Sequence, residues 1–261
     1  LVDIACAHSY CVNPSIKYLR RKLLSKKIDS SYSNNGTWIF LDRLDKADDN
    51  AEYLYRWIAD HHPNQKIKFA LYASSPDWQR LEKDGFDLLA YGSKRWEQET
   101  KSCSVIISSQ FDVLTFNPFQ NGYFSGTKKI VTLQHGVTKD NISKLVNHIP
   151  FDMFVTSMPR ETDSIVKDGS PYSMLKKDVI QAGLPRHDQL VKQTAKTIIL
   201  IAPTWRRSLF SGSTYSFEVD SATRKVFSNS NFASSWKELL FSEKLRDIAQ
   251  EHHFSLVLKP H

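Results

Sequence analysis

The sequence predicts an α/β protein built on a parallel β-sheet. Short apolar runs alternate with segments of helical periodicity along most of the 261-residue chain, and this alternation is typical of consecutive βαβ units. Hydrophobic residues make up 41% of the chain and can bury a sizeable core, while charged residues make up 24%, an ordinary globular level. The length fits one large domain or two moderate ones.

The chain begins with a basic segment. Residues 14–27 ("PSIKYLRRKLLSKK") have helical periodicity, with an apolar stripe opposite a strongly basic face. A polar loop follows at 30–36. We therefore expect residues 1–35 to form a basic, helical N-terminal segment. Its basic face suits an anionic membrane surface, and packing against the first domain with a solvated basic face is the alternative.

From residue 36 onward, the expected elements alternate as the fold class requires. Asp48, Asp49 or Asn50 can cap a helix at 48–63. Further helices are expected at 77–85, 94–101 and near 160–168. The expected strands span residues 37–41, 66–74, 86–93, 103–109, 128–134, 151–157 and 178–183.

A second unit is expected to begin near residues 190–196. A polar stretch there precedes a fresh apolar strand at 196–205, and a long helical, serine-rich segment leads to a further strand in "SLVLKPH". We assign residues 36–193 to the first domain and 194–261 to the second. The second domain is too short to be complete, so we expect it to be truncated and the natural chain to continue beyond His261.

The charge and cysteine content restrict the partners and the compartment. The formal net charge of +7 favours an anionic partner. Three cysteines argue against a disulfide framework and favour a reducing cytoplasm. No apolar run approaches the roughly 18 residues of a membrane span. No second Cys/His pair follows Cys6, His8 and Cys11 at zinc spacing, so no metal is expected, and nothing indicates Mg²⁺ or another cofactor.

Polar residues follow the ends of several predicted strands. His135 and Gly136 follow the strand at 128–134, and Arg186 and His187 follow the strand at 178–183. Open α/β sheets bind ligands at the carboxyl ends of their strands. Imidazole suits proton transfer near neutral pH, and arginine matches phosphate oxygens. For each of these residues, a structural or merely solvated role is the alternative.

The second unit repeats this pattern. Thr204 and Arg206 lie in "APTWRR", and Lys259 and His261 end the last strand. Four strand ends in two units thus deliver a cation or an imidazole, and such a set suits a diphosphate. The chain has no Walker lysine loop and no GxGxxG, so neither an ordinary ATPase nor a dehydrogenase is indicated. Basic residues interleaved with aromatics are also missing, and nucleic acid is not expected as a partner.

Five segments, taken in order, resemble the CDP-glycerol glycerophosphotransferase family of teichoic-acid primases, teichoic-acid polymerases and related capsule polymerases. They are "TWIFLDRLDKADDNAEYLYRWIADHHP", "LQHGVTKDN", "GLPRHDQL", "APTWR" and "LVLKPH". The resemblance implies a GT-B architecture, in which two Rossmann-like domains face each other across a cleft. The first would bind the acceptor and the second the donor nucleotide.

The resemblance also implies an activity. Family members move a polyol phosphate from a CDP-polyol, such as CDP-glycerol or CDP-ribitol, to a hydroxyl of a growing polymeric or lipid-linked acceptor, and they release CMP. A cytoplasmic protein held peripherally at the inner face of the cell membrane would fit this role in cell-envelope synthesis. Val137, Thr138 and Lys139 depart from the Thr-Pro that commonly follows Gln-His-Gly in wall polymerases, which leaves the polyol and the acceptor open.

By position, the resemblance assigns His135 and His261 as catalytic residues. His135 would take the proton of the acceptor hydroxyl, while Arg186, Arg206 and His261 would stabilise charge on the pyrophosphate. The remaining implied substrate-binding residues are Gln134, Gly136, Asp188, Thr204 and Lys259. Two alternatives stay open: a GT-B glycosyltransferase that uses a nucleotide sugar, and a non-catalytic α/β module that binds anions.

Overall fold

The computed structural model describes residues 36–111, 128–147, 149, 151–190, 197–204, 206–209 and 221–259. The chain divides into two compact units, residues 1–191 (unit 1) and 192–261 (unit 2), and each is described by itself. The basic segment expected at 1–35 lies outside the described residues. Among the described helices, none is long and apolar enough to cross a membrane.

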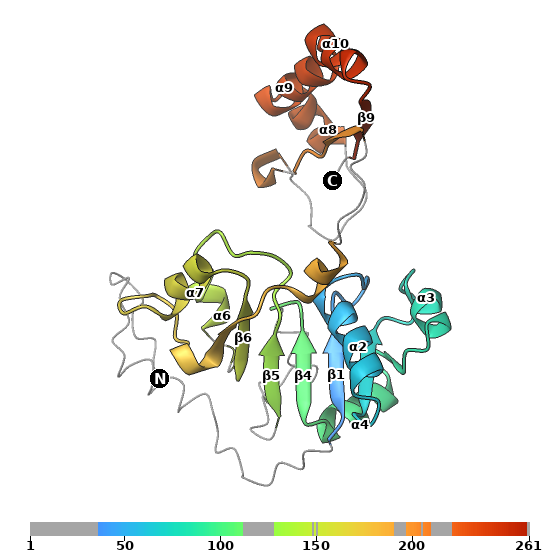
Figure 1. Ribbon diagram of the computed structural model, residues 1–261, viewed down its shortest axis with the longest axis vertical. Coiled ribbons are helices and arrows are strands. Elements are labelled where there is room, and N and C mark those ends of the chain that lie inside the picture. Colours follow the sequence, from blue (N-terminus) through green and yellow to red (C-terminus); the bar gives the residue numbers. More distant parts are fainter. Residues whose placement is uncertain are drawn as a thin grey trace. The chain divides into compact units, whose positions relative to one another are not determined.

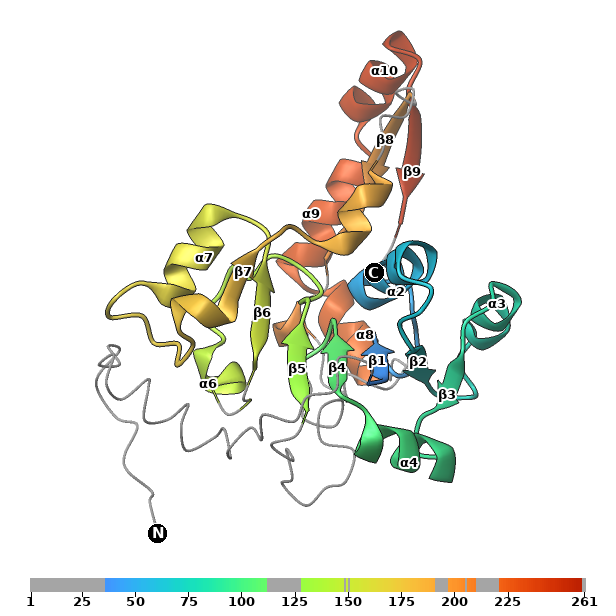
Figure 2. The same ribbon diagram turned by 60° about the horizontal axis from the view of Figure 1, so that its bottom comes forward.

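Unit 1 contains a seven-stranded sheet in which every neighbouring pair of strands is parallel (Figure 1; Figure 2). The predicted α/β class is confirmed, and each strand expected between residues 37 and 183 is present. The strands are β1 (Trp38–Leu41), β2 (Ile67–Leu71), β3 (Leu88–Ala90), β4 (Val105–Ser108), β5 (Lys129–Thr132), β6 (Met153–Thr156) and β7 (Val179–Gln181).

The strand order is β3-β2-β1-β4-β5-β6-β7. The chain starts in the middle of the sheet at β1, moves outward to β3, and returns to β4 on the other side of β1. This reversal is the switch point of a doubly wound α/β fold, where a crevice opens outside the carboxyl ends of the strands. The β1–β4 junction is therefore where a ligand site is expected in unit 1.

Helices connect the strands of unit 1, and their ends follow ordinary capping rules. In α2, Asp49 is the N-cap and its side chain accepts from the Asn50 N–H, which is one of the three caps predicted. In α4, the Ser93 side chain accepts from the Trp96 N–H. The helical elements are α2 (Asn50–His61), α3 (Trp78–Lys83), α4 (Lys94–Ser102), α6 (Ser143–Val146), α7 (Pro159–Val166), and the 3₁₀ turns η1 (Lys176–Asp178) and η2 (Pro185–Gln189).

Both faces of the sheet are covered by apolar side chains, as parallel sheets require. Successive strand residues point to opposite faces: Ile39 and Leu41 lie in one buried cluster, and Phe40 lies in the other. In the second cluster, Tyr55 of α2 stacks on Phe86 with 4.1 Å between ring centroids. This packing fixes α2 against β1 and β2, so that the N-terminus of α2 lies at the carboxyl edge of the sheet.

Some elements are shorter than predicted. The strand expected at 86–93 covers only Leu88–Ala90, because the chain turns at Gly92, which has a φ of 82°. The strand expected at 196–205 ends at Ile201, ahead of Pro203. In each case a glycine or proline ends the strand before the end of the apolar run from which the strand was predicted.

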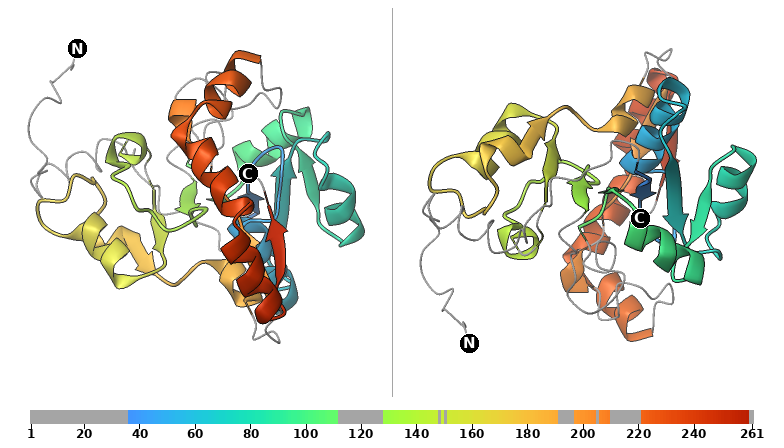
Figure 3. Two further views of the ribbon diagram at one scale, coloured as in Figure 1. Left: turned by 90° about the horizontal axis from the view of Figure 1, so that it is seen from above. Right: turned by 90° about the horizontal axis from the view of Figure 1, so that it is seen from below.

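Unit 2 is a single βαβ arrangement: its two strands lie side by side in Figure 2, and Figure 3 shows the red helices that lie between them in the sequence. Strands β8 (Ile198–Ile201) and β9 (Ser255–Leu258) are parallel and pair in register from Ile198↔Ser255 to Ile201↔Leu258. Between them lie the 3₁₀ turn η3 (Arg207–Leu209) and the helices α8 (Ser221–Ser228), α9 (Asn231–Leu240) and α10 (Glu243–Glu251). The expectation that this domain is incomplete stays a prediction.

Replacing Phe69 by alanine tests the aromatic packing of unit 1. Phe69 is fully buried, so Phe69→Ala is expected to lower the free energy of unfolding by about 3–5 kcal/mol through lost burial and the cavity it leaves. Urea denaturation measures this. Trp57→Ala, at a side chain that is 47% exposed, is the matched control and should change it by only about 0.5 kcal/mol. Equal effects would contradict the packing described here.

Candidate functional site

Polar residues from four strand ends meet at the carboxyl edge of unit 1. Asp42 follows β1, Ser109 follows β4, His135 follows β5, and Arg186 lies in η2 after β7. The N-terminus of α2 lies among them, because Asp49 and Asn50 contact residues from three of these ends. The site therefore forms beside the β1–β4 switch point.

The buried carboxylate of Asp42 organises this edge. Its Oδ1 accepts from Ser109 Oγ at 2.6 Å and from the Ala51 N–H at 2.9 Å. Its Oδ2 accepts from the N–H groups of Asp49 and Glu52 at 3.0 and 3.2 Å. Burial raises the pKa of Asp42 to about 7, against the opposing effect of the Ser109 and backbone hydrogen bonds. A negative charge here also complements the helix dipole of α2.

Asp42 has a chemical consequence for α2. Nucleotide-binding α/β folds often hold a phosphate on the free N–H groups at this helix N-terminus. Here the side chains of Asp42 and Asp49 and the Asp49 carbonyl accept from all four of the first N–H groups, those of residues 50–53. The start of α2 is thus closed to an external anion of that kind.

Asn50 joins α2 to two other parts of the site. It is fully buried, and both ends of its amide are used. Nδ2 donates to the Gln134 carbonyl oxygen at 2.7 Å, and Oδ1 accepts from the Arg186 N–H at 3.1 Å. One side chain therefore sets the position of the backbone before His135 and of the backbone that carries Arg186.

Asp49 contacts the side chain of Arg186. Arg186 Nη1 donates to Asp49 Oδ1 at 2.6 Å, in an ion pair that is partly shielded from solvent. Burial raises the pKa of Asp49, and the hydrogen bond from the Asn50 N–H and the positive charges of Arg186 and His135 oppose this rise. Asp49 thus lies within electrostatic range of both His135 and Arg186.

His135 is exposed at this edge, with its ring centroid 6.2 Å from that of Phe111. Nearby protein atoms nevertheless remove enough water from the ring to lower its pKa, and the charges of Arg43 and Arg186 add to this effect. Asp49 and a hydrogen bond with the Ser109 backbone act in the opposite direction. The net lowering keeps the imidazole neutral at pH 7, which is the form that can accept a proton.

The turn after β5 is made by Gln134 rather than by Gly136. Gln134 has a φ of 59°, while a Cβ added to Gly136 would meet no atom within 4 Å. The left-handed residue therefore lies two positions before the glycine. The open space around Gly136 is compatible with close approach of a ligand, which stays a prediction.

The fully buried side chain of Gln134 holds this loop in place. Nε2 donates to the Val155 carbonyl at 2.6 Å and to Glu161 Oε1 at 3.0 Å, and Oε1 accepts from the Thr138 hydroxyl. Glu161 also accepts from the Thr138 N–H at 3.0 Å. These bonds tie the loop that carries His135 to β6 and α7. We infer a positioning role for this side chain, and direct contact of Gln134 with substrate stays a prediction.

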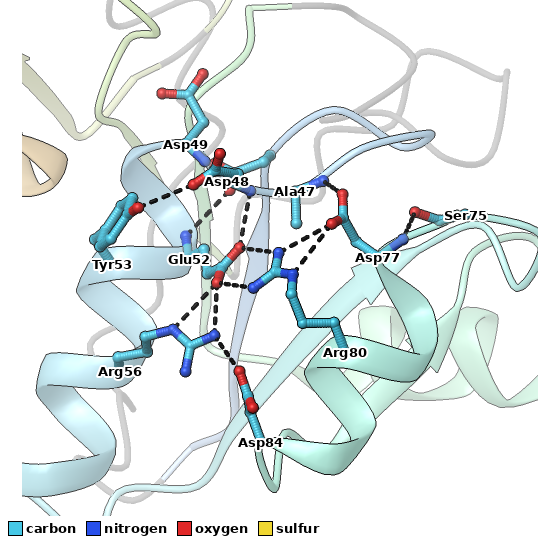
Figure 4. Close-up of polar contacts among 11 residues, drawn as sticks. Ala47, Asp48, Asp49, Glu52, Tyr53, Arg56, Ser75, Asp77, Arg80 and Asp84 are labelled. Carbon is cyan, nitrogen blue, oxygen red and sulfur yellow. Dashed lines mark hydrogen bonds and ion pairs between the residues drawn. The ribbon is translucent and has the colours of Figure 1, made fainter.

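A network of ion pairs around Glu52 holds the loop that precedes α2 (Figure 4). The guanidinium of Arg80 donates to both oxygens of the buried Glu52, at 2.7 and 2.8 Å, and Arg56 adds a further pair. Burial alone would raise the pKa of Glu52, but hydrogen bonds from Arg80 and Arg56 hold it below its ordinary value. Glu52 Oε2 also accepts from the Asp48 N–H at 2.8 Å.

This network positions Asp49 indirectly. The Asp48 backbone is left-handed, with a φ of 71°, a conformation that costs free energy for a residue with a side chain. The bond to Glu52 and a bond from the Ala47 N–H to Asp77 Oδ2 at 2.9 Å hold the loop in this conformation. Asp49 therefore begins α2 from a backbone that is fixed on both sides.

The other predicted site residues are distributed as follows. Asp188 is exposed within η2, two residues after Arg186. In unit 2, Thr204 and Arg206 follow β8 and Lys259 follows β9, so that they extend from the carboxyl ends of two paired strands. The Arg206 guanidinium lies over the Phe232 ring, 4.9 Å from its centroid. His261 lies outside the described residues.

Asp42, Arg43, Asp49 and Asn50 are not among the site residues predicted from the sequence. Asp49 and Asn50 are predicted there only as helix caps. The sequence feature that could have indicated them is the charged run "DRLDKADDN", which directly follows the first strand of a parallel sheet. Among the described residues, no group of three or more His, Cys, Asp or Glu side chains could hold a metal ion.

Comparisons with known proteins give consistent results. A model of the family described as CDP-Glycerol:Poly(glycerophosphate) glycerophosphotransferase matches residues 25–261. The minor teichoic acid biosynthesis protein GgaB of Bacillus subtilis (strain 168) is 32% identical over 236 residues, which are 88% of this chain and 26% of that protein. The chain thus spans about a quarter of the length of this curated relative.

Solved structures of the wall teichoic acid polymerase TagF have a similar fold. One matches with a TM-score of 0.51 at 16% identity, and a variant of it matches with a TM-score of 0.55 at 16% identity. Each match covers 94% of this chain and 61% of the TagF chain. At this level of identity the likeness concerns the fold alone.

Asn50→Ala tests the link between α2, β5 and η2. The substitution leaves the Gln134 carbonyl and the Arg186 N–H without their partner, and each such group costs about 1–3 kcal/mol. The free energy of unfolding is expected to fall by about 2–5 kcal/mol, measured by urea denaturation. Gln65→Ala is the control, because it removes a partly exposed bond to the Gly36 carbonyl. A loss no larger than in this control would show that Asn50 is dispensable.

Asp49→Asn tests the coupling between Asp49 and His135. A nearby negative charge favours the imidazolium, so its removal is expected to lower the pKa of His135 further. The pH titration of the His135 Cε1–H signal by NMR measures this shift. Asp84→Asn, which removes a carboxylate paired with Arg56, should leave the titration of His135 unaltered. The same pKa for His135 in Asp49→Asn and in the unsubstituted protein would exclude the coupling.

Proposed function

Because the chain belongs to the CDP-glycerol:poly(glycerophosphate) glycerophosphotransferase family, we propose that it transfers a polyol phosphate from a CDP-polyol to a hydroxyl of a growing polymer and releases CMP. CDP-glycerol is the first donor to test, with CDP-ribitol as the second. The acceptor would be a teichoic-acid-like or capsule polymer. The single observation that carries this proposal is the position of His135 at the strand-end edge where Asp49 and Asn50 also hold Arg186.

The proposed reaction is one in-line displacement. The acceptor oxygen attacks the β-phosphorus of the donor, and a new O–P bond forms as the bond from this phosphorus to the oxygen of the CMP group breaks. The CMP oxygen leaves with the electron pair, and the acceptor proton passes to the imidazole of His135. General base catalysis of this kind typically contributes about 10²–10⁴-fold in rate.

Electrostatic stabilisation is the second contribution. Charge develops on the phosphoryl oxygens in the transition state, and fixed cations stabilise it more than mobile water does. We assign Arg186 to this role in unit 1, because Asp49 and Asn50 hold both its side chain and its backbone. Asp188, the next-but-one residue of the same turn, is proposed to bind substrate.

The two units would divide the substrates. We assign the acceptor to unit 1, where His135 lies, and the donor nucleotide to the strand-end residues of unit 2. The closed N-terminus of α2 supports this assignment, because a phosphate site of the dinucleotide-binding kind is occupied in unit 1 by Asp42. Thr204, Arg206, Lys259 and His261 are the proposed donor-side residues.

Association with an anionic membrane surface stays a prediction from residues 16–27. It would keep the protein at the inner face of the cell membrane, near a lipid-linked acceptor. Liposome sedimentation at low and high salt tests it, since electrostatic attraction weakens as salt is added.

His135→Ala tests the proposed reaction. The variant is expected to lower kcat for CMP release from CDP-glycerol by about 10²–10⁴-fold or more while circular dichroism shows a folded protein, because the proton acceptor is lost. His61→Ala is the control, since His61 is an exposed histidine in the last turn of α2, the end opposite Asp49. Near-normal turnover in folded His135→Ala would exclude the catalytic role. Release of CDP or UDP would instead indicate glycosyl transfer.

A further inference from the structure

We propose that Arg43 is a further phosphate-binding residue of this site. It lies at the same carboxyl edge of the sheet as His135 and Arg186. The inference rests on the proposed function for the identity of the phosphate, which belongs either to the acceptor polymer or to the donor. Its chemistry is the same in both cases: an anionic phosphoryl oxygen that accepts from a guanidinium.

Strand register brings Arg43 to the level of Gln134, the residue directly before His135. Leu41 of β1 pairs with Ser108 of β4, and Ser108 pairs with Thr132 of β5. Beyond these pairs, the Ser109 N–H donates to the Leu41 carbonyl at 3.1 Å and the Leu133 N–H donates to the Ser108 carbonyl at 2.9 Å. Residues 43 and 134 therefore leave the sheet at the same level, with β4 alone between their strands.

The distance between these strands suits a shared ligand. Neighbouring strands lie about 4.8 Å apart, so β1 and β5 lie on the order of 10 Å apart. A phosphate group fits between a long side chain from one strand end and an imidazole from the other. The effect of Arg43 on the pKa of His135 agrees with this proximity, because it disfavours the imidazolium.

The backbone of Arg43 is fixed on both sides. Asp42, directly before it, is fully buried and accepts four hydrogen bonds. The carbonyl of Leu44, directly after it, accepts from the Tyr72 N–H at 2.7 Å. A side chain on such a base loses less conformational freedom on binding than one on a mobile loop.

The guanidinium of Arg43 is exposed and has no carboxylate partner among the described residues. By contrast, Arg56, Arg80, Arg95 and Arg186 each pair with an Asp or Glu. Pairing with Asp49 leaves Arg186 with part of its charge compensated. Arg43 therefore supplies uncompensated positive charge at this edge, and its planar guanidinium donors match phosphate oxygens.

Arg43→Gln is the test, with Arg43→Lys and Arg95→Gln beside it. Loss of one charge-assisted hydrogen bond is expected to raise the KM of one substrate by about ten- to a hundredfold. Arg43→Lys keeps the positive charge but not the paired guanidinium donors. Its KM should therefore lie between that of the unsubstituted protein and that of Arg43→Gln. Arg95→Gln removes an exposed arginine that pairs with Asp87, and it should leave both KM values within about twofold.

Separate KM measurements for the acceptor and for the donor identify the source of the phosphate. A higher KM for the polymer acceptor assigns Arg43 to an acceptor phosphodiester, and a higher KM for CDP-glycerol assigns it to the donor. If both KM values stay within about twofold of those of the unsubstituted protein, Arg43 does not bind phosphate in the reaction and the proposal is wrong.

A binding measurement separates this proposal from the proposed function. Inorganic phosphate is expected to shift the His135 Cε1–H signal in the unsubstituted protein and in Arg95→Gln, and to shift it much less in Arg43→Gln. The pKa of His135 should also rise in Arg43→Gln, opposite in sign to Asp49→Asn. These results would stand even if no CMP were released. Equal phosphate shifts and an unchanged pKa in Arg43→Gln would overturn the role of Arg43.

Discussion

The buried carboxylate of Asp42 is the interaction on which the rest of the site depends. It accepts from Ser109 of the neighbouring strand end and from three N–H groups at the start of α2. These bonds fix α2 at the switch point of the sheet. A buried carboxylate is costly unless it is fully hydrogen-bonded, so the arrangement is stable only when all of these donors converge on it.

The functional geometry follows from the position of α2. Asn50 then reaches the Gln134 carbonyl and the Arg186 N–H, and Asp49 reaches the Arg186 guanidinium. Glu52, one turn further along, holds the loop that precedes the helix through Asp48. One short sequence, Asp48 to Glu52, therefore positions residues from β5 and η2 without itself having to touch a substrate.

The electrostatic balance of the site suits a base that works beside anions. Burial is the main cause of the lowered pKa of His135; Asp49 opposes it, and the charges of Arg43 and Arg186 add to it. The imidazole can then be neutral in the free protein and still accept a proton once an anionic substrate has offset the charge of the arginines. The closed N-terminus of α2 leaves these side chains, rather than backbone N–H groups, as the groups that meet phosphate in unit 1.

The sequence by itself determined the alternation of strands and helices, the parallel class of the sheet, and the strand-end positions of His135 and Arg186, because these depend on local periodicity and on short motifs. Only the tertiary structure decided what Asp42, Asp49, Asn50 and Arg43 do. Their partners lie far along the chain: Asn50 bonds Gln134 across 84 residues, and Asp49 bonds Arg186 across 137. Likewise, Gln134, and not the nearby Gly136, adopts the left-handed conformation, because bonds to Val155 and Glu161 hold it there. Local propensity cannot anticipate contacts of this range, since they exist only once the sheet has brought its strand ends together.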